Sequence, residues 1–482
     1  MTAANLEMAS SPALETRVSD RQTRVLMVGF LLTLITFVVR LVPAASLKAV
    51  VADVGIYQDM AGYVFRGDNI YQRHLFFPYL PFSQFHPALA LWMSESLGMA
   101  FDLAIKLIPI LTDSLATIVL YAFLVGRTKN LKSAIFWTAV WALNPVSIMI
   151  TAYHGNIMSS VAFFAMAAYL AMEYAREGAN RTRYLAISAL CLGIGIAFRT
   201  FPILMLPILV ILGPRTVKEA VVYVGLALLP GLLSSLPYLL WAREAFLSEI
   251  LNYGGTTDIG WASVLRTIPY FASGVRLTTF GGELTDFTKG IFLVAYATLV
   301  LLVPYFRSSS LGRAMSLMPL FFYVFYAGVA AQYLVWVIPI AIAIRHRLVL
   351  SHTVFSTMAL YGFYRWYFPE ILGGRQPLPP MNTDVIVAVY ILGNALLFLN
   401  GLIWVGEIAL SEMRRYRRSL FGDSTALVKA LRVVWSSLTY RAAIIAILLI
   451  LWLPQFLSMI RYIPRLMRSV LPPTYHSYFP DF

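Results

Sequence analysis

The sequence predicts an all-α polytopic membrane protein, and three observations carry that prediction. Hydrophobic residues make up 59% of the 482 residues, whereas charged residues make up only 12%. Mean hydropathy is +0.74, and apolar runs of about 17–25 residues, long enough to cross a bilayer as helices, recur along the chain. Lys and Arg gather in short segments between these runs, so the net charge of +14 indicates topology and gives no reason to expect a nucleic-acid partner.

The first 24 residues are polar and precede a run from Val25 to Val39 that contains no charge. A cleavable signal peptide would begin in the same way, and Ala44-Ala45-Ser46 loosely resembles a cleavage site. Because many apolar runs follow, we expect an uncleaved first helix over about 25–48, with residues 1–24 as a cytoplasmic tail. Residues 25–482 are then expected to form a single transmembrane domain.

A polar, aromatic-rich stretch follows the first helix, and we expect it to form the first extracytoplasmic loop, over 49–103, with interfacial helices. The apolar region 85–126 that it leads into allows two interpretations. It could cross the membrane twice, or it could form an interfacial helix over 85–100 and one crossing over about 104–126. We favour the second, since it leaves the next basic segment in the cytoplasm; the first would reverse the sidedness of every later segment.

The later apolar runs alternate with basic segments in a way that keeps those segments on one side of the membrane. They predict helices over 133–151, 157–174, 184–213 (two short spans broken at Pro202), 219–241, 288–305, 314–331, 334–344, 352–367, 384–405 and 442–460. A second outer loop is expected over 242–287 and a C-terminal tail over 461–482. The total is about 13 crossings, within a range of about 11–14.

Asp53, directly after the first helix, is the candidate catalytic residue. A carboxylate partly removed from water at the mouth of a cavity can act as a general base; a solvated surface charge or a helix cap is the alternative. Asp59 lies six residues further on, so the two would not share a helical face. We therefore expect Asp53 at the start of the loop, with Asp59 on a short helix after it. Asp59 and Arg66 are candidate substrate-binding residues.

Further candidate substrate-binding residues lie at the expected outer ends of helices. His154 could bond a phosphate or a sugar hydroxyl, or only backbone. Arg199 interrupts an apolar run, where a guanidinium must bind an anion such as phosphate, pair, or snorkel to lipid headgroups. Gln332 and Tyr333 could bind substrate or join helices. Trp261, in the second outer loop, offers an aromatic surface for a sugar, although interfacial belts use Trp as well.

The sequence predicts no metal cofactor. Histidine and cysteine do not cluster with ligand spacing, and Asp53-Val54-Gly55 lacks a second nearby carboxylate, so a divalent cation has no support. No nucleotide-binding glycine loop or serine nucleophile motif is evident either.

Several short motifs, taken in order, resemble those of GT-C glycosyltransferases. The likeness is to the catalytic subunit of GPI mannosyltransferase I and to bacterial polyprenyl-phosphate-mannose-dependent mannosyltransferases, over roughly residues 50–340. The motifs are Asp53 with Tyr57-Gln58-Asp59-Met60-Ala61, Asp113, His154-Gly155-Asn156, Arg199-Thr200-Phe201-Pro202 and Gln332-Tyr333-Leu334-Val335-Trp336. Two departures stand out: Gly55 replaces the second acid of the family's Asp-x-Asp motif, and Arg199 replaces a lysine.

The resemblance implies a GT-C-type fold with a catalytic first extracytoplasmic loop. It also implies an inverting glycosyltransferase, a mannosyltransferase by likeness, that moves a hexose from a polyprenyl-phosphate donor to a lipid or glycan acceptor. Asp53 would be the general base, and Arg199 would stabilise the leaving phosphate. The reaction would take place on the extracytoplasmic face, among membrane lipids. A prokaryotic cell membrane is favoured because no ER signal is evident, and an ER location stays open.

Two other classes of function compete with this one. A lipid-linked sugar transporter or flippase would use intramembrane charges along a pathway, but the polar residues here gather at one face. A polysaccharide ligase with a pyrophosphate-linked donor would be expected to need several arginines in a large outer loop; the loop 242–287 has Arg243, Arg266 and Arg276. The sequence leaves open the sugar, the acceptor, the oligomeric state and any partner subunit.

Overall fold

The computed structural model describes residues 12–46, 52–73, 77–178, 180–251, 255–273, 282–302, 311–373 and 378–421. Within these ranges the protein is built from helices and contains no strand. The expected crossing over 442–460 and the expected tail over 461–482 lie outside the described residues.

Among the residues described, seven helices are long and apolar enough to cross a membrane. They are Gln22–Ser46 within α1 (Pro12–Ser46), α4 (Phe101–Thr128), Leu131–His154, α7 (Met158–Glu177), α8 (Arg181–Phe198), α10 (Val217–Trp241) and Thr383–Glu412 within α18 (Thr383–Phe421). The third comprises α5 (Leu131–Ala142), α6 (Pro145–Ile148) and the π-helical turn η4 (Met149–His154). This confirms the prediction of an all-α polytopic membrane protein.

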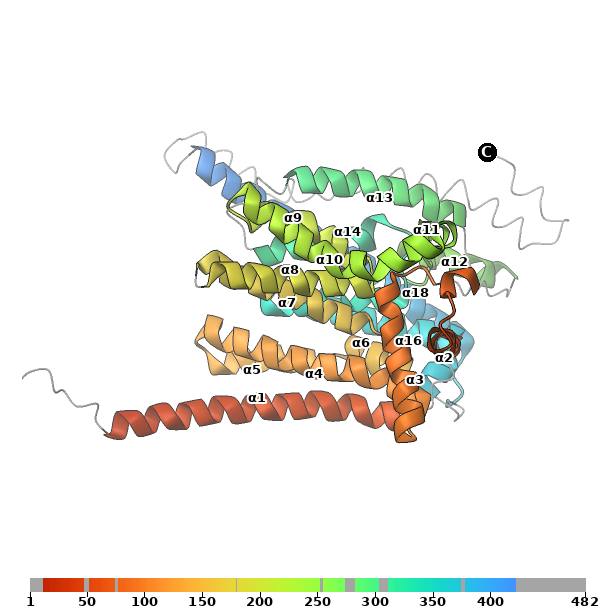
Figure 1. Ribbon diagram of the computed structural model, residues 1–482, viewed down its shortest axis with the longest axis horizontal. Helices are drawn as coiled ribbons and strands as arrows, with labels where there is room; N and C mark the ends of the chain where they lie inside the picture. The colour runs from red at the N-terminus through yellow and green to blue at the C-terminus, as the bar shows by residue number, and fades with distance from the viewer. Residues whose placement is uncertain are drawn as a thin grey trace, which may run out of the picture.

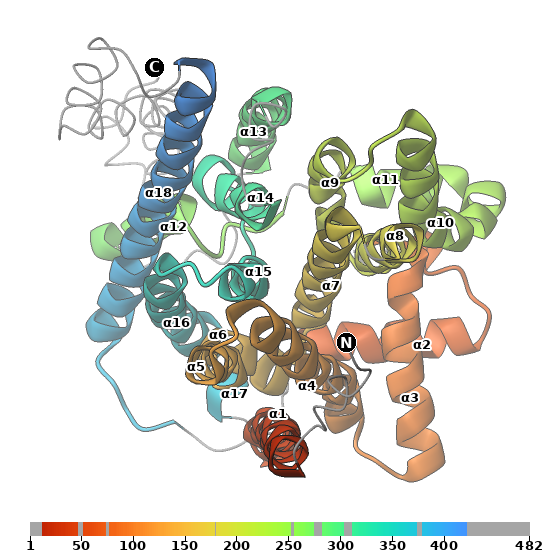
Figure 2. The same ribbon diagram turned by 90° about the vertical axis from the view of Figure 1, so that its left-hand side faces the viewer.

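Further helices, outside these seven, complete the bundle. They are η5 (Phe201–Met205), α9 (Leu206–Leu212), α13 (Gly282–Leu302), α14 (Leu311–Phe325), η7 (Ala331–Val335), α15 (Ile338–Ala343) and α16 (Leu348–Tyr367). Seen end-on, α16 packs beside α18 on one flank, and α8 packs beside α7 and α10 on the other (Figure 2). Since several of these elements are too short or too polar to count as spans, the predicted total of about 11–14 crossings stays a prediction.

One end of the bundle carries helices that do not follow its long axis (Figure 1). They belong mainly to the two segments expected as outer loops: α2 (Ala52–Phe65), η2 (Ile70–Arg73), η3 (Pro81–Gln84), α3 (Phe85–Leu97), α11 (Arg243–Leu251), α12 (Trp261–Ser273) and α17 (Pro369–Gly373). α3 lies across the ends of the long helices, the orientation expected of a helix at a membrane surface. We call this the Asp53 end.

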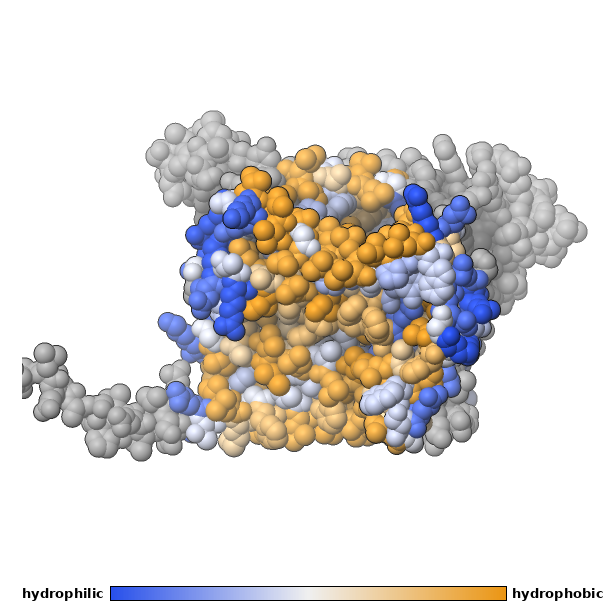
Figure 3. All heavy atoms as spheres, viewed as in Figure 1, coloured by the Kyte–Doolittle hydropathy of each residue, from blue (hydrophilic) through white to orange (hydrophobic). Residues whose placement is uncertain are grey.

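The surface of the bundle is divided as a membrane protein requires. An apolar band crosses the middle of the visible face, and hydrophilic residues gather at the two ends (Figure 3). Large apolar side chains of α10 such as Leu232, Leu233 and Leu236 are exposed. Such a continuous apolar surface is stable in contact with lipid tails and unstable in water.

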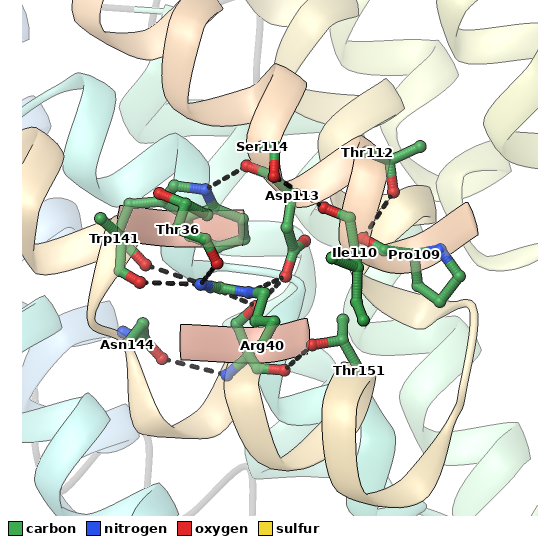
Figure 4. Close-up of polar contacts among 12 residues, drawn as sticks. Thr36, Arg40, Pro109, Ile110, Thr112, Asp113, Ser114, Trp141, Asn144 and Thr151 are labelled. Carbon is green, nitrogen blue, oxygen red and sulfur yellow. Dashed lines mark hydrogen bonds and ion pairs between the residues drawn. The ribbon is translucent and has the colours of Figure 1, made fainter. Parts of the chain in front are cut away.

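A buried ion pair links the first long helices of the bundle (Figure 4). Arg40 of α1 and Asp113 of α4 are fully buried, and the guanidinium Nε lies 2.6 Å from the Asp113 carboxylate. Arg40 also donates to the backbone oxygen atoms of Thr36, Trp141 and Ala142. A charge in this environment is tolerated only when it is paired, so this pair holds α1 against α4 and α5.

Two boundaries differ from the sequence-based expectation. α1 begins at Pro12, so the second half of the expected tail over 1–24 continues the helix. Asp53 and Asp59 both belong to α2, whereas Asp53 was expected in the loop before it. An acidic residue in the first turn is stabilised by the partial positive charge at a helix N-terminus, so Asp53 can start the helix.

Candidate active site

Asp53 stands in the first turn of α2 at the Asp53 end of the bundle. Its side chain is 39% exposed, so it can meet a ligand that arrives from outside. The only bond to its carboxylate among the residues described comes from His154, whose Nε2 lies 3.0 Å from Oδ2. The other carboxylate oxygen, Oδ1, is therefore open to a substrate.

His154 is the last residue of η4, the π-helical turn that follows α5 and α6 along the chain, and its side chain extends from there to Asp53. Gly155 follows in the left-handed region, at φ +78°, and stops the helix. A Cβ atom on Gly155 would lie 3.2 Å from Cγ of Lys106, so glycine also allows the close approach to α4. On its other side, His154 Nδ1 lies 2.9 Å from the hydroxyl of Tyr364 in α16.

Arg199 lies where α8 stops and η5 begins, and the sequence explains the break. Pro202 cannot continue the helical hydrogen bonds, and Arg199 adopts an extended conformation as the C-cap of α8. Its side chain is 3% exposed and donates to the Phe198 carbonyl and to the hydroxyl of Tyr57. The guanidinium carbon Cζ of Arg199 lies 3.5 Å from the ring centre of Tyr79, which makes a cation–π contact.

Tyr57 joins the two halves of the site. It lies one helical turn after Asp53 on α2, and its hydroxyl is 3.3 Å from Arg199 Nη2. Asn156, just beyond the π-helical turn, points its Nδ2 at the same hydroxyl at 3.5 Å. The ring packs edge-on against His86 of α3. α2 therefore presents a carboxylate and a phenol to the segments that carry His154 and Arg199.

Arg199 differs from the other buried arginines. In the described part of the chain three arginine side chains are buried, namely Arg40, Arg199 and Arg266. Arg40 pairs with Asp113 at 2.6 Å, and Arg266 pairs with Asp258 at 2.9 Å. Arg199 has no described carboxylate within ion-pair distance, and its Nε is buried without a hydrogen-bond partner. A buried guanidinium without a counter-charge is costly, so this position suits an anionic ligand.

The charges around Asp53 keep it ionised. Burial alone would raise the pKa of its carboxyl group, but the hydrogen bond from His154 and the electrostatic attraction of His154 and Arg199 outweigh that effect. The pKa of Asp53 therefore lies below its ordinary value. Burial lowers the pKa of His86 to about 4, with Arg199 acting in the same direction. At neutral pH, Asp53 thus carries a negative charge and His86 carries none.

An apolar cavity of about 220 Å³ opens beside the break after Arg199. Thr200 and Phe201 of the break line one side, and α13 lines another with Phe292 and Leu293. Tyr333, one of the sequence-predicted site residues, lines it as well. Its ring stacks on that of Trp336 with the ring centres 4.1 Å apart. The cavity can take an apolar chain whose polar end lies near Arg199.

Other sequence-predicted site residues are not brought to Asp53. Asp59 is exposed, and its position six residues along α2 turns it to another face. Arg66 follows the far end of α2, about 20 Å along the helix axis, and pairs with Asp68 on the surface. Gln332 is half-buried in η7 next to Tyr333. Trp261 is buried at the start of α12, which packs against α18, so it offers no open sugar platform.

Sequence reasoning assigned no role to three residues of this site. Tyr57 belongs to a motif that was noted only for its family likeness, and the spacing of residues does not reveal that Tyr57 and Tyr79 contact Arg199. Tyr364 lies more than 200 positions after His154, within an apolar run, and carries no sequence signal.

No metal site is evident in the described ranges, where His, Cys, Asp and Glu nowhere gather in groups of three or more. A metal-free reaction stays a prediction. Comparisons with known proteins indicate no function for the chain: no family model matches it, and no curated protein matches it.

Proposed function

We propose that the protein is an inverting glycosyltransferase that moves a hexose from a polyprenyl-phosphate donor to the hydroxyl group of a lipid or glycan acceptor. The supporting observation is a half-exposed, ionised Asp53 beside Arg199, the buried arginine that lacks a carboxylate partner in the described chain. The first residue supplies a base and the second a site for an anion. By the family likeness the hexose is mannose and the reaction takes place on the extracytoplasmic face.

The donor phosphate would bind Arg199. A guanidinium offers a planar fork of donors that suits phosphate oxygens, and the unpartnered Nε leaves part of that fork available. The charge on this phosphate grows as the glycosidic bond breaks, so a cation held in a protected site favours the transition state. The prenyl chain would leave through the neighbouring cavity, whose walls at Phe292, Leu293 and Trp336 are apolar.

Asp53 would act on the acceptor. Its free Oδ1 accepts the proton of the acceptor hydroxyl as that oxygen forms a bond to the anomeric carbon. The bond between this carbon and the phosphate oxygen breaks in the same step, and the lipid phosphate leaves with the electron pair. A single displacement from the opposite side inverts the anomeric configuration. Because Asp53 is 39% exposed, it can afterwards release the proton to water.

The direct test measures sugar transfer by the purified protein in lipid. Polyprenyl-phosphate-mannose or polyprenyl-phosphate-glucose, labelled in the sugar, is supplied with a total lipid extract as acceptor. Asp53→Asn keeps the side chain's shape but cannot accept a proton, so transfer should fall by about 10²–10⁴-fold. Asp59→Asn makes the same chemical change on an exposed face of α2 and should leave the rate near that of the wild type.

Two results would contradict the proposal. Transfer that survives in Asp53→Asn and fails in Asp59→Asn would move the base to Asp59. Absence of transfer from either donor, together with movement of labelled lipid across a vesicle membrane, would identify a flippase.

A further inference from the structure

Three side chains from distant segments lie in one row at the Asp53 end. Asp53 of α2 contacts His154 of η4 at 3.0 Å, and His154 contacts Tyr364 of α16 at 2.9 Å. The rings of His154 and Tyr364 meet edge to face, with centres 5.7 Å apart. Tyr364 is fully buried, His154 nearly so, and only Asp53 reaches the surface. The row therefore runs from the core of the bundle outward to the carboxylate.

With the His154 ring neutral, the chemistry of the three groups fixes the protons in this row. An ionised carboxylate only accepts, so Nε2 of His154 must carry a proton and donate it to Asp53. In a neutral imidazole Nδ1 is then an acceptor, and the hydroxyl of Tyr364 donates to it. Within the described chain that hydroxyl has no other partner. Tyr364 therefore selects the ring tautomer that can hold Asp53.

We infer that His154 and Tyr364 form a positioning pair, which fixes the Asp53 carboxylate through Oδ2 and leaves Oδ1 aimed at the acceptor hydroxyl. This rests on the proposed role of Asp53 as the base. His154 was expected from the sequence to bind substrate, but both of its ring nitrogens are occupied by protein groups. Neither member of the pair takes the substrate proton, since Asp53 can exchange protons with water directly.

The backbone supports this assignment. His154 ends a π-helical turn, and such turns insert one residue into an α-helix. One residue changes the direction of the following side chain by about 100°. The π-helical turn thus sets the direction in which His154 points, toward α2 on one side and α16 on the other. This is a costly local geometry of the kind often found at functional sites.

The pair should also set the pH range of the reaction. The groups that face Asp53 are Tyr57 on its own helix, His154, Arg199 and Tyr364. Burial pushes the pKa of Asp53 up, and the His154 hydrogen bond is the next largest influence and pushes it down. Without the Tyr364 hydroxyl, the His154 ring is free to turn or change tautomer, and that bond is lost for part of the time. The pKa of Asp53 should rise, and the acid limb of the rate should move to higher pH.

Tyr364→Phe tests the pair, with Tyr361→Phe as its matched control. Tyr361 lies one turn earlier on α16, half-buried, and its hydroxyl has no hydrogen-bond partner in the described residues. For Tyr364→Phe we expect kcat for polyprenyl-phosphate-mannose to fall about 10-fold, with KM unchanged and the acid limb shifted upward. A merely structural role would lower stability without moving the pH profile. If Tyr364→Phe matches Tyr361→Phe in rate and pH profile, the inference is wrong.

A second readout does not depend on catalysis. Histidine labelled with ¹⁵N gives separate NMR signals for protonated and bare ring nitrogens. The signal of His154, one of six histidines, is assigned by its loss in His154→Gln. We expect one tautomer, protonated at Nε2, in the wild type and a mixture in Tyr364→Phe. If the wild type transfers no sugar, the proposed function fails. A fixed tautomer that depends on Tyr364 would then still support the pair, and a tautomer indifferent to Tyr364 would overturn it.

Discussion

Arg40 and Arg199 are both buried in the same membrane bundle, and they serve it in opposite ways. Arg40 faces the carboxylate of Asp113 at 2.6 Å and donates as well to the Ser147 hydroxyl and to backbone oxygen atoms. Arg199 donates to one carbonyl and to the phenol of Tyr57, and its Nε has no hydrogen-bond partner in the part of the chain that the structure describes. The first arginine is neutralised by the protein. The second forms no ion pair with a carboxylate among the residues described.

We propose that this difference separates a charge that holds the fold from a charge that binds a ligand. Burial alone does not separate them, since both side chains are at most 3% exposed. Arg266 resembles Arg40: its guanidinium pairs with Asp258 and contacts the ring of Tyr367. The arginines differ in whether a described carboxylate pairs with the guanidinium. Substitutions at Arg40, at Arg199 and in the neighbouring cavity test what this difference means.

The largest effect is expected at the neutralised arginine. Arg40→Met leaves Asp113 as a buried, unpaired carboxylate and should destabilise the protein by about 3–5 kcal/mol. Thermal unfolding in detergent measures this as a large drop in Tm. Replacing both partners, Arg40→Met with Asp113→Leu, should recover most of the loss, since no lone charge remains. A double variant as unstable as Arg40→Met would show that the pair does more than cancel charge.

The unpaired arginine should show the reverse pattern. Arg199→Gln removes a charge that forms no ion pair with a carboxylate in the described chain, so Tm should stay the same or rise. Sugar transfer should fall by about 10²–10³-fold, the usual effect of losing one group that stabilises an oxyanion. Arg266→Gln is the matched control and should lower Tm, because it leaves Asp258 unpaired. An Arg199→Gln protein that unfolds readily would place Arg199 with Arg40, as a structural residue.

A smaller effect is expected in the cavity next to Arg199. Leu293→Trp adds a ring to its wall and should displace about two methylene groups of a prenyl chain, raising KM for a long-chain donor about 10-fold. A donor with a short, water-soluble prenyl chain should be little affected. Leu301→Trp, on an exposed stretch of the same helix away from the cavity, is the control. Equal effects of Leu293→Trp on both donors would exclude the cavity as the chain's path.

The smallest effect is the response to pH. Because the pKa of Asp53 lies below its ordinary value, the carboxylate stays ionised as pH falls from 8 to about 5. The rate should be nearly constant over that interval and decline only at a pH below the ordinary titration range of an aspartate, where Asp53 gains a proton. The stability that its bond to His154 provides is lost in the same low range. A rate that already falls below pH 7 would require another titrating group.

The helices were predictable because membrane spans leave a strong apolar signal. The break at Arg199 and Pro202 was predicted as well, since proline interrupts a helix for a local reason. The start of α2 was not, because Asp53 in a first helical turn and Asp53 in a loop have the same sequence. Several short helices fell below the length that marks a span, so the number of crossings stays open.

The charged residues of the site could be predicted from the sequence, but the residues that they contact could not. Asp53, His154 and Arg199 stood out because polar residues are rare in such a chain, and the structure places all three at one end. Their partners Tyr57 and Tyr364 are aromatic, and aromatic residues make up 14% of this sequence. Which tyrosine meets which charged residue depends on how helices pack over more than 100 positions. Periodicity within one helix carries no such information.

The most direct test of the account is the affinity of the protein in nanodiscs for polyprenyl phosphate and for the uncharged polyprenol of equal length. By this proposal the two lipids would fill the same apolar cavity, and they differ only in the anion that Arg199 is proposed to bind. We expect the wild type to prefer the phosphate at least about 10-fold, an energy of about 1.4 kcal/mol. Arg199→Gln should lose this preference, whereas Arg266→Gln should keep it if it folds. Equal affinity of the wild type for both lipids would contradict the claim that Arg199 awaits an anion.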